Sequence, residues 1–563
     1  MEDKPITSDP KTADHGHAHH GPSSRSVVLA ISAILVFFAF ATWMGWPKQW
    51  MHHGHHDDHS EHAEHEEHPD DEQHHEHDSD DADAEDEEPS GHEVDGGSEE
   101  AEPSHSHADE HTAHMPAFYA VIPFLGLLGC IAVLPLIRAT EHWWESNLHR
   151  FYVAAGLAVV TLLYYFFLHT GGGGDKVVSV LQHAILLEYI PFIVLLFALY
   201  SISGGIRITG DMAAHPLTNS AFITVGGLLA SFIGTTGAAM LLIRPLLETN
   251  RERKNVQHTV VFFIFVVCNC GGCLLPIGDP PLFLGYLKGV NFMWTMWELW
   301  LPWLVVNVIL VAVYYVWDRF FAYPQETVRD ISRDETELRP LRVVGLWPNA
   351  LLLVGVIFSV ALLDSSKPFP GTTWKPWPFL REAVQLGLVA LSLLLGSEKV
   401  RSANKFNYHA IIEVAALFIG IFICMQPALE ILNEKGSDLG LTQPWQMFWA
   451  TGGLSAVLDN APTYVVFFET AANDPAFEGE KFATLVSQTG EKAARANELL
   501  VGISLGAVFL GAMTYIGNGP NFMVKAIAEQ SGIKMPSFFG YVIKYSGPIL
   551  IPIFILATLL FLI

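Results

Sequence analysis

Basic residues and cysteines are scarce in this chain. Of its 563 residues, 31 are lysine or arginine and 59 are aspartate or glutamate, and no stretch gathers positive charge into a patch. A nucleic-acid partner is therefore not expected, because nucleic-acid binding relies on clustered basic side chains. The few cysteines all lie in apolar segments and do not indicate a disulfide framework. They are Cys130, Cys268, Cys270, Cys273 and Cys424.

Charge of either sign is also rare outside one segment. Most acidic residues lie between residues 57 and 110, so the net charge of −28 describes that stretch rather than the whole chain. Half of the residues are hydrophobic, which is too apolar for an ordinary soluble enzyme. The sequence "CNCGGC" at 268–273 allows a metal knuckle, but we favour small residues that let helices pack closely.

Apolar runs of membrane-spanning length recur along the chain. Spanning segments are expected at 27–46, 116–138, 149–168, 177–200, 258–288, 296–317, 345–364, 379–396, 408–428, 498–528 and 537–562. Two longer runs, 218–248 and 445–470, are interrupted by "GTTG" and "DNAP". These interruptions predict re-entrant hairpins, because non-helical backbone at membrane depth is tolerated only inside protein. The expected fold class is an all-α polytopic membrane protein, a multi-pass protein of a bacterial inner membrane.

The N-terminal region divides into three parts. Residues 1–26 are expected to form a cytoplasmic tail, and 27–46 a first transmembrane helix. A secretory signal is the alternative for 27–46, since "AFA" at 39–41 resembles a cleavage site. The third part is residues 47–115, and the rest of the chain, 116–563, is the expected membrane domain.

Residues 47–115 hold sixteen of the 27 histidines, interleaved with aspartate and glutamate. This segment has too few apolar residues to bury a core, which predicts a disordered external loop. Two interpretations remain open: a solvated polyanion, or a weak zinc trap, because imidazole and carboxylate are suitable zinc ligands. The candidate zinc ligands are His52, His53, His55, His56, His59, His62, His65 and His68.

Basic residues in the loops agree with an external histidine-rich segment. The loops at 318–344 and 397–407 then lie on the cytoplasmic side and are rich in lysine and arginine. The external loop at 365–378 is poor in them, as the positive-inside rule requires. The rule is satisfied only if both interrupted runs are hairpins. If either run crossed the membrane once, the loops after it would lie on the opposite side of the membrane.

Two motifs occur twice, in the same order. "PIGDPPLF" at 276–283 matches "YIGNGPNF" at 515–522, and "SFIGTTGAAMLL" at 231–242 aligns with "AVLDNAPTYVVF" at 456–467. Two such matches at a similar separation are hard to obtain by chance.

The expected topology gives the two copies opposite orientations. It therefore predicts an inverted repeat with two re-entrant hairpins and two discontinuous helices, as in secondary transporters. Repeat 1 covers about 183–317 and repeat 2 about 409–562.

Prolines predict a helix break within each copy. Proline lacks a backbone donor and clashes with the preceding turn, so "GDPP" and "GNGP" each end one half-helix and begin another. Asp279 aligns with Asn518 at this break. An aspartate at membrane depth costs about 2.5–3.5 kcal/mol, and it is normally paired, protonated or bound to an ion. Capping of a half-helix is the alternative role.

The tip of the second hairpin, "SAVLDNAPTY", supplies a second aspartate beside a proline. In the expected fold both hairpin tips meet both helix breaks at the centre of the membrane. Carboxylates, hydroxyls and amides gathered there form an oxygen-rich shell suited to Na⁺ or a proton. The predicted ion- or substrate-binding residues are Asp279, Asp459, Asn460, Asn518, Thr235, Thr236, Asn269, Thr463 and Asn521.

These motifs resemble the ion-transporter superfamily, which includes citrate and dicarboxylate carriers, arsenite permeases and D-type bacterial sodium/proton antiporters. "NCGGCLLPIGDPP" is similar to the antiporters' glycine–aspartate break, and "SAVLDNAP" to their hairpin tip. "LPLIRATEHWWE" resembles their early loop. The resemblance covers about 116–563. Within the superfamily, the chain is most similar to a group named for citrate transport or sodium:proton antiport. It implies an elevator-like or rocking cycle, often in a homodimer.

The first hairpin tip departs from the antiporter pattern. Antiporters tend to carry Asp-Asn there, whereas this chain has Gly234, Thr235 and Thr236. The cation-binding shell is therefore expected to be asymmetric.

Sodium/proton antiport is the expected function, since two carboxylates attract cations and repel an anion. Na⁺ and H⁺ are then the transported ions, and no other cofactor is expected. The alternative is cation-coupled uptake of citrate or another organic anion, using Arg244, Lys288 or Lys525. For these three basic residues, snorkelling toward a membrane surface is the interpretation we favour.

Two further classes are weaker. An intramembrane aspartyl protease would use Asp279 and Asp459 as a dyad, but "PIGDPP" lacks the usual first glycine, so an enzyme is not expected. A divalent-metal exporter would use the histidine-rich loop as a collector.

Glu188 and Glu413 occupy equivalent positions in the two repeats. We expect both to cap helices at the membrane interface, with a proton relay as the alternative.

Overall fold

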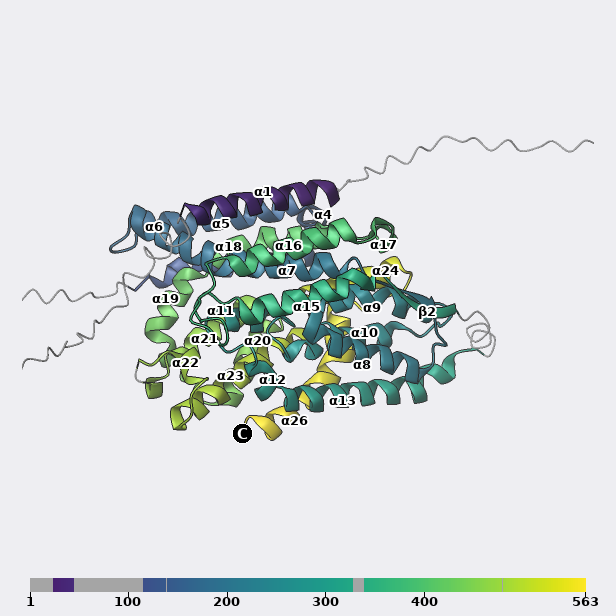
Figure 1. The fold of residues 1–563 in the computed structure, drawn as a ribbon. Helices are drawn as coiled ribbons and strands as arrows, with labels where there is room; N and C mark the ends of the chain where they lie inside the picture. Colours follow the sequence, from purple (N-terminus) through teal and green to yellow (C-terminus); the bar gives the residue numbers. More distant parts are fainter. Residues whose placement is uncertain (1–23, 45–114, 138, 328–338, 478) are drawn as a thin grey trace, which may run out of the picture. The chain divides into compact units, whose positions relative to one another are not determined.

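The computed structural model describes residues 24–44, 115–137, 139–327, 339–477 and 479–563. Within these ranges the chain is predominantly helical (Figure 1). The expected tail up to residue 23 and the histidine-rich loop, with its eight candidate zinc ligands, lie outside the described residues.

The described helices fall into three groups along the chain. The first is α1 (Ser24–Trp43), η1 (Phe118–Val121), α3 (Ile122–Val133), η2 (Leu134–Leu136), α4 (Glu141–Trp144), α5 (Asn147–Phe167), α6 (Gly174–Leu181), η3 (Gln182–Tyr189) and α7 (Ile190–Ser203). The second is α8 (Pro216–Ile233), α9 (Thr235–Thr249), α10 (Gln257–Val267), η4 (Cys270–Cys273), α11 (Pro280–Leu287), α12 (Trp294–Glu298), α13 (Trp300–Trp317), η5 (Asp318–Ala322) and η6 (Tyr323–Gln325). The third is α15 (Leu346–Leu362), α16 (Leu380–Leu395), α17 (Glu398–Ala403), α18 (His409–Cys424), α19 (Gln426–Lys435), η7 (Gly436–Leu439), α20 (Pro444–Ser455), α21 (Asn460–Ala472), η8 (Pro475–Phe477), α22 (Phe482–Leu485), α23 (Glu491–Leu510), η9 (Gly511–Met513), α24 (Gly519–Gln530), α25 (Phe538–Tyr541), η10 (Val542–Ser546) and α26 (Gly547–Phe561).

Among the described residues, seven helices are long and apolar enough to cross a bilayer. They are Ser24–Thr42, Asn147–Phe167, Gly174–Ser203, Pro216–Ile233, Trp300–Gln325, Glu491–Met513 and Phe538–Phe561. The pair His409–Cys424 and Gln426–Leu439 passes the same test but is bent by 42°. Apolar helices of this number and length confirm the all-α, multi-pass membrane class.

Helix breaks occur at the four predicted positions. Only Gly234 separates α8 from α9, and four residues separate α20 from α21. The run 258–288 divides into α10 and α11, and the fourth predicted break lies between α23 and α24. Each of the later half-helices α11 and α24 has proline within its first two positions, which accounts for where it begins.

A two-stranded antiparallel sheet departs from the all-helical expectation. β1 (Arg207–Asp211) pairs with β2 (Arg339–Val344), so that Arg207 lies opposite Val344 and Asp211 opposite Arg339. The expected loop at 318–344 therefore contains a strand. Both strands are short, and a short strand is stabilised by pairing with its partner strand rather than by its own sequence pattern.

A buried ion-pair network joins the loop after α9 to the end of α13. Asp318 is fully buried, and its two carboxylate oxygens accept hydrogen bonds of 3.0 and 2.5 Å from Arg253. The Nε2 atom of His258 lies 3.0 Å from the same carboxylate. Glu326 is a more distant partner, with 3.7 Å between its Oε1 and Nε of Arg253.

We expect Asp318→Asn to lower the free energy of unfolding by about 3 kcal/mol, because it leaves a buried guanidinium without its nearest counter-charge. Thermal unfolding of the purified protein in detergent measures this loss. Glu529→Gln is the matched control, since it makes the same chemical change in the partly exposed Lys525–Glu529 pair. Equal stability of the two variants would contradict the assignment.

Candidate functional site

Asp279 lies at the centre of the candidate site and is 1% exposed. Its carboxylate makes no capping bond to α11, so the structure does not support the helix-cap alternative for this residue. Instead Oδ1 accepts hydrogen bonds from the Thr235 hydroxyl, at 3.0 Å, and from Nδ2 of Asn518, at 3.1 Å. Oδ2 accepts a 2.6 Å bond from Nδ2 of Asn460. One carboxylate is thus held by three neutral side chains from distant parts of the sequence.

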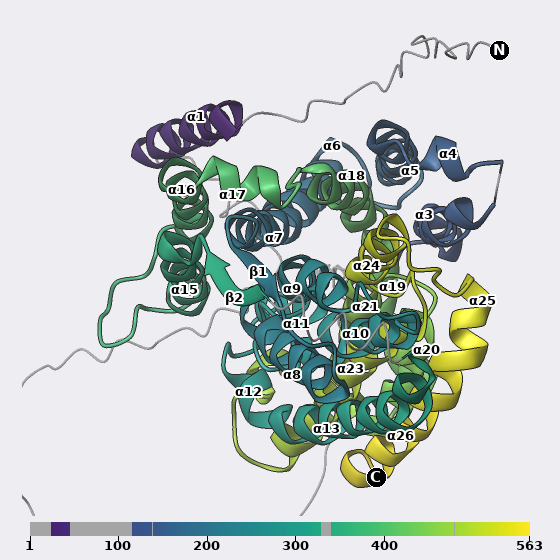
Figure 2. The ribbon, with the colours of Figure 1, turned by 90° about the vertical axis from the view of Figure 1, so that its right-hand side faces the viewer.

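Four helices begin at this cluster. Thr235 and Asn460 are the first residues of α9 and α21, while Asp279 and Asn518 immediately precede α11 and α24. Figure 2, which views many of the helices end-on, shows α9, α11, α21 and α24 close together, beside α10. Helix N-termini carry partial positive charge, and they favour a negative group at the point where they meet.

A second set of hydrogen bonds, between asparagine side-chain amides, joins the two helix breaks. Nδ2 of Asn269 donates to Oδ1 of Asn521 at 2.8 Å, and Nδ2 of Asn518 lies 3.3 Å from Oδ1 of Asn269. Asn521 in turn donates to the backbone carbonyls of Gly511 and Thr514, both at 2.9 Å. The break before α11 is therefore fixed directly to the break before α24.

Five predicted site residues do not bind the Asp279 carboxylate: Asn269 and Asn521, described above, and three residues near the starts of α9 and α21. Asp459 is half-buried and caps α21, because its Oδ1 accepts a 3.1 Å bond from the backbone N–H of Ala461. The hydroxyl of Thr463 donates to the backbone carbonyl of Asp459 at 2.9 Å, and Thr236 is half-buried. Asp459 is thus next to the cluster through its neighbour Asn460, but it is not hydrogen-bonded to Asp279.

At both helix breaks, a glycine lies very close to the backbone of a neighbouring segment. A Cβ atom added at Gly278 would lie 2.2 Å from the carbonyl oxygen of Gly272, and one added at Gly517 would lie 2.6 Å from that of Gly511. Neither position leaves room for a side chain. The glycines of both motifs are therefore required by packing at equivalent points of the two breaks.

One buried acceptor at the site has no hydrogen-bond partner in the described structure. Asn460 is 0% exposed, and its Oδ1 atom is left unpaired while Nδ2 bonds to Asp279. A buried acceptor without a donor is costly. This oxygen, beside a carboxylate, can be satisfied by a cation or by an added proton donor.

A family model described as "Putative citrate transport" matches residues 112–562. The chain belongs to this family. No curated protein matches the sequence. The match includes every residue of the cluster around Asp279 and leaves out the first 111 residues, which hold most of the histidine-rich loop. It confirms a transporter family of the kind that the motifs resemble, without distinguishing the antiporters within it.

The three basic residues considered for anion recognition contact other groups in this citrate-transport family member. Lys288 pairs with Glu469 at 2.5 Å, and Lys525 with Glu529 at 3.0 Å. Arg244 donates to the backbone carbonyl of Asn404. None of these bonds reaches Asp279.

Two hydroxyl residues that the motif comparison missed support the breaks. The hydroxyl of Ser231 donates to the carbonyl of Gly271 at 2.6 Å and accepts from the N–H of Leu274 at 3.1 Å. The hydroxyl of Thr514 donates to the carbonyl of Ala456 at 2.6 Å and accepts from the N–H of Gly517. Each hydroxyl fixes one pair of consecutive helices, α8–α9 or α20–α21, to a helix break. Their position within four residues of a tip or break was the available signal.

The cysteine motif does not form a metal site in the described part of the chain. Cys268, Cys270 and Cys273 are buried free thiols. Across the residues that the structure describes, no group of three or more His, Cys, Asp or Glu side chains is placed to hold a metal ion. Close packing by small residues is the interpretation that agrees with the structure.

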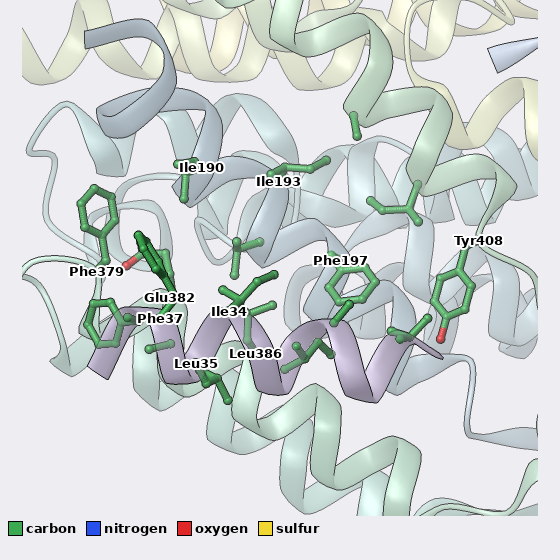
Figure 3. Close-up of a pocket in the computed structure, with 18 of the residues that line it drawn as sticks. Ile34, Leu35, Phe37, Ile190, Ile193, Phe197, Phe379, Glu382, Leu386 and Tyr408 are labelled. Atoms are coloured by element: carbon green, nitrogen blue, oxygen red, sulfur yellow. The ribbon is translucent and has the colours of Figure 1, made fainter. Parts of the chain in front are cut away.

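A large cavity lies apart from Asp279. It has a volume of about 690 Å³ and is lined by α1, α7, α16 and α18 (Figure 3). Its lining is apolar except for a few groups such as Glu382 and Tyr408. Small ions and organic acids need polar partners, so this cavity is not the candidate transport site.

Proposed function

We propose that this protein exchanges sodium ions for protons across a bacterial cell membrane. The observation that carries the proposal is the buried Asp279 carboxylate, bonded to Thr235, Asn460 and Asn518 and, among the described residues, to no basic side chain. A carboxylate in this setting attracts a cation and repels an organic anion. The unpaired Oδ1 of Asn460 supplies a further ligand for a cation.

In this proposal, exchange follows because a sodium ion and a proton compete for the Asp279 carboxylate. When Asp279 carries a proton, its negative charge is absent and a sodium ion loses its strongest ligand. When sodium binds, the proton must leave. In this proposal Asp459, at the neighbouring hairpin tip, adds negative potential, and Asn269, Asn521, Thr236 and Thr463 complete the polar surroundings. Na⁺ and H⁺ are the only ions that the cycle requires.

The proposed architecture is an inverted repeat of about 183–317 and about 409–562, with two re-entrant hairpins and two discontinuous helices. Its support is local: Asp279 and Asn518 both precede a half-helix in extended conformation, and Gly278 and Gly517 make the same close approach. Residues 116–563 form the transport domain in this proposal. The bilayer surrounds it, and a homodimer is expected from the resemblance.

Cation-coupled uptake of citrate or another organic anion is the second candidate, and the family description favours it. In that case the proposed sodium site would supply coupling, and the anion would need basic partners. Arg244, Lys288 and Lys525 would have to leave the contacts that they make in this structure.

Proton flux in proteoliposomes tests the proposal, with Na⁺, Li⁺, K⁺ and citrate added in turn. We expect sodium-driven proton flux in the wild type and at least about a ten-fold loss in Asp459→Asn. Asparagine still caps a helix, so the variant keeps the fold while losing the charge. Unchanged exchange would remove Asp459 from the mechanism. Uptake of labelled citrate without sodium-driven proton flux would favour the second candidate.

A further inference from the structure

Lys288 holds two carboxylates from different parts of the fold. Its Nζ atom lies 2.5 Å from Oε1 of Glu469 and 3.7 Å from Oε1 of Glu188. All three side chains are mostly buried, with exposed fractions of 17%, 14% and 9%. The first distance is a direct hydrogen bond, whereas the second is too long for one and is purely electrostatic.

The closer pair joins α11 and α21, two of the four helices that begin at the candidate site. Lys288 lies nine residues after Asp279, at the end of α11, and Glu469 lies nine residues after Asn460, in α21. At 1.5 Å per residue, both charges are about 14 Å from the site. α11 and α21 pack against each other, near α19 and at the same end as α6 (Figure 1). The pair therefore fixes the two half-helices in register.

The more distant pair crosses to another group of helices. Glu188 lies in the π-helical segment η3, which packs against α6, α7 and α18. The second oxygen of Glu188 accepts a 3.2 Å bond from Nε2 of Gln426, and Gln426 also donates to the carbonyl of Phe422 in α18. Glu188 thus keeps a hydrogen-bond donor on its own side if Lys288 moves away. Loss of the Lys288 contact therefore leaves Glu188 with one hydrogen-bond donor and Glu469 with its ion pair.

We propose that Lys288 is a positioning residue for cation exchange, and that its contact with Glu188 opens during the transport cycle while its pair with Glu469 stays intact. This rests on the proposed function, because an alternating cycle must move the helices that carry Asp279 against their neighbours. The Lys288–Glu188 contact then stabilises the state seen here relative to the opposite state. Glu469 keeps α11 and α21 together as they move.

Two isosteric variants separate these roles. In Glu188→Gln the contact with Lys288 is weakened while Gln426 keeps an acceptor, and in Glu469→Gln the pair within the site helices is weakened instead. The half-saturating sodium concentration for proton flux is measured in right-side-out and in inside-out vesicles. For Glu188→Gln we expect shifts of about five-fold in opposite directions on the two faces, because one state loses stability relative to the other. For Glu469→Gln we expect a lower maximal rate without opposite shifts. Equal shifts on both faces in Glu188→Gln, or none, would overturn the proposal.

A distance measurement tests the same inference without transport. Spin labels at Leu187→Cys and Trp297→Cys report on η3 and on α12, and both positions are exposed. The background carries Cys130→Ser, since Cys130 is half-buried and the other cysteines are buried. Adding Glu188→Gln should change the population of the label distances, and adding Glu469→Gln should not. An unchanged distribution in Glu188→Gln would refute the inference. A changed one without sodium-driven flux in the wild type would refute the proposed function and the role in cation exchange, and it would retain only the opening of the Lys288–Glu188 contact.

Discussion

Asp279→Asn should abolish sodium-driven proton flux, with a loss of at least about 100-fold, while the protein still folds. The substitution removes the only carboxylate that all three neutral donors bind. Its amide oxygen can still accept from Thr235 and Asn518. Its new N–H group replaces the oxygen that accepts from Nδ2 of Asn460, so the Asn460 amide must turn over for its Oδ1 to accept instead. The site then keeps a hydrogen bond to each of the three neighbours, and Nδ2 of Asn460 loses its acceptor, while the exchangeable charge is lost. Flux in proteoliposomes and thermal unfolding in detergent measure the two properties separately.

Glu413→Gln is the matched control for this substitution. Glu413 pairs with Arg150 at 2.7 Å, away from the candidate site, and the change from carboxylate to amide is the same. We expect sodium-driven flux within about two-fold of the wild type, since Glu413 pairs with Arg150 and with no residue of the Asp279 cluster. A loss as large as that in Asp279→Asn would favour the proton-relay alternative for Glu413 and would weaken the assignment of Asp279.

The helix breaks could be predicted because their cause is local. Proline cannot continue a preceding helix, so "GDPP" and "GNGP" indicate a break whatever surrounds them. The β1–β2 pair could not be predicted in this way. Arg207 and Val344 are opposite each other only because the chain brings two short segments together from more than 130 residues apart. The ion pairs of Asp318 and Lys288 also depend on long-range packing, so their partners could not be identified from the sequence.

The candidate site could be predicted only in part. Thr235, Asn460 and Asn518 contact Asp279, as the aligned motifs predicted, whereas Asp459 and Thr236 do not. The reason lies in helix geometry: neighbouring residues at a helix start point about 100° apart, so only one of two adjacent polar residues faces the carboxylate. At each tip the motif supplied two adjacent candidates, and their direction was set by how α9 and α21 pack. Sequence position identified the tips but could not choose between the two residues.

Gly517→Ala should lower the free energy of unfolding by about 3 kcal/mol, because the added methyl group is forced against backbone atoms. Its Cβ would lie 2.6 Å from the carbonyl oxygen of Gly511 and 2.7 Å from that of Ser455, neither of which can move aside as a side chain can. Gly519→Ala, two residues later, is the matched control, since nothing lies within 4 Å of a Cβ there and alanine favours the start of α24. Thermal unfolding of both variants in detergent measures the difference. Equal stability would mean that the break before α24 is not closely packed, and it would remove the main local support for equivalent packing of the two breaks. A large loss in Gly517→Ala alone would show that the break needs glycine for space, which is the condition for Asn518 to reach the carboxylate of Asp279.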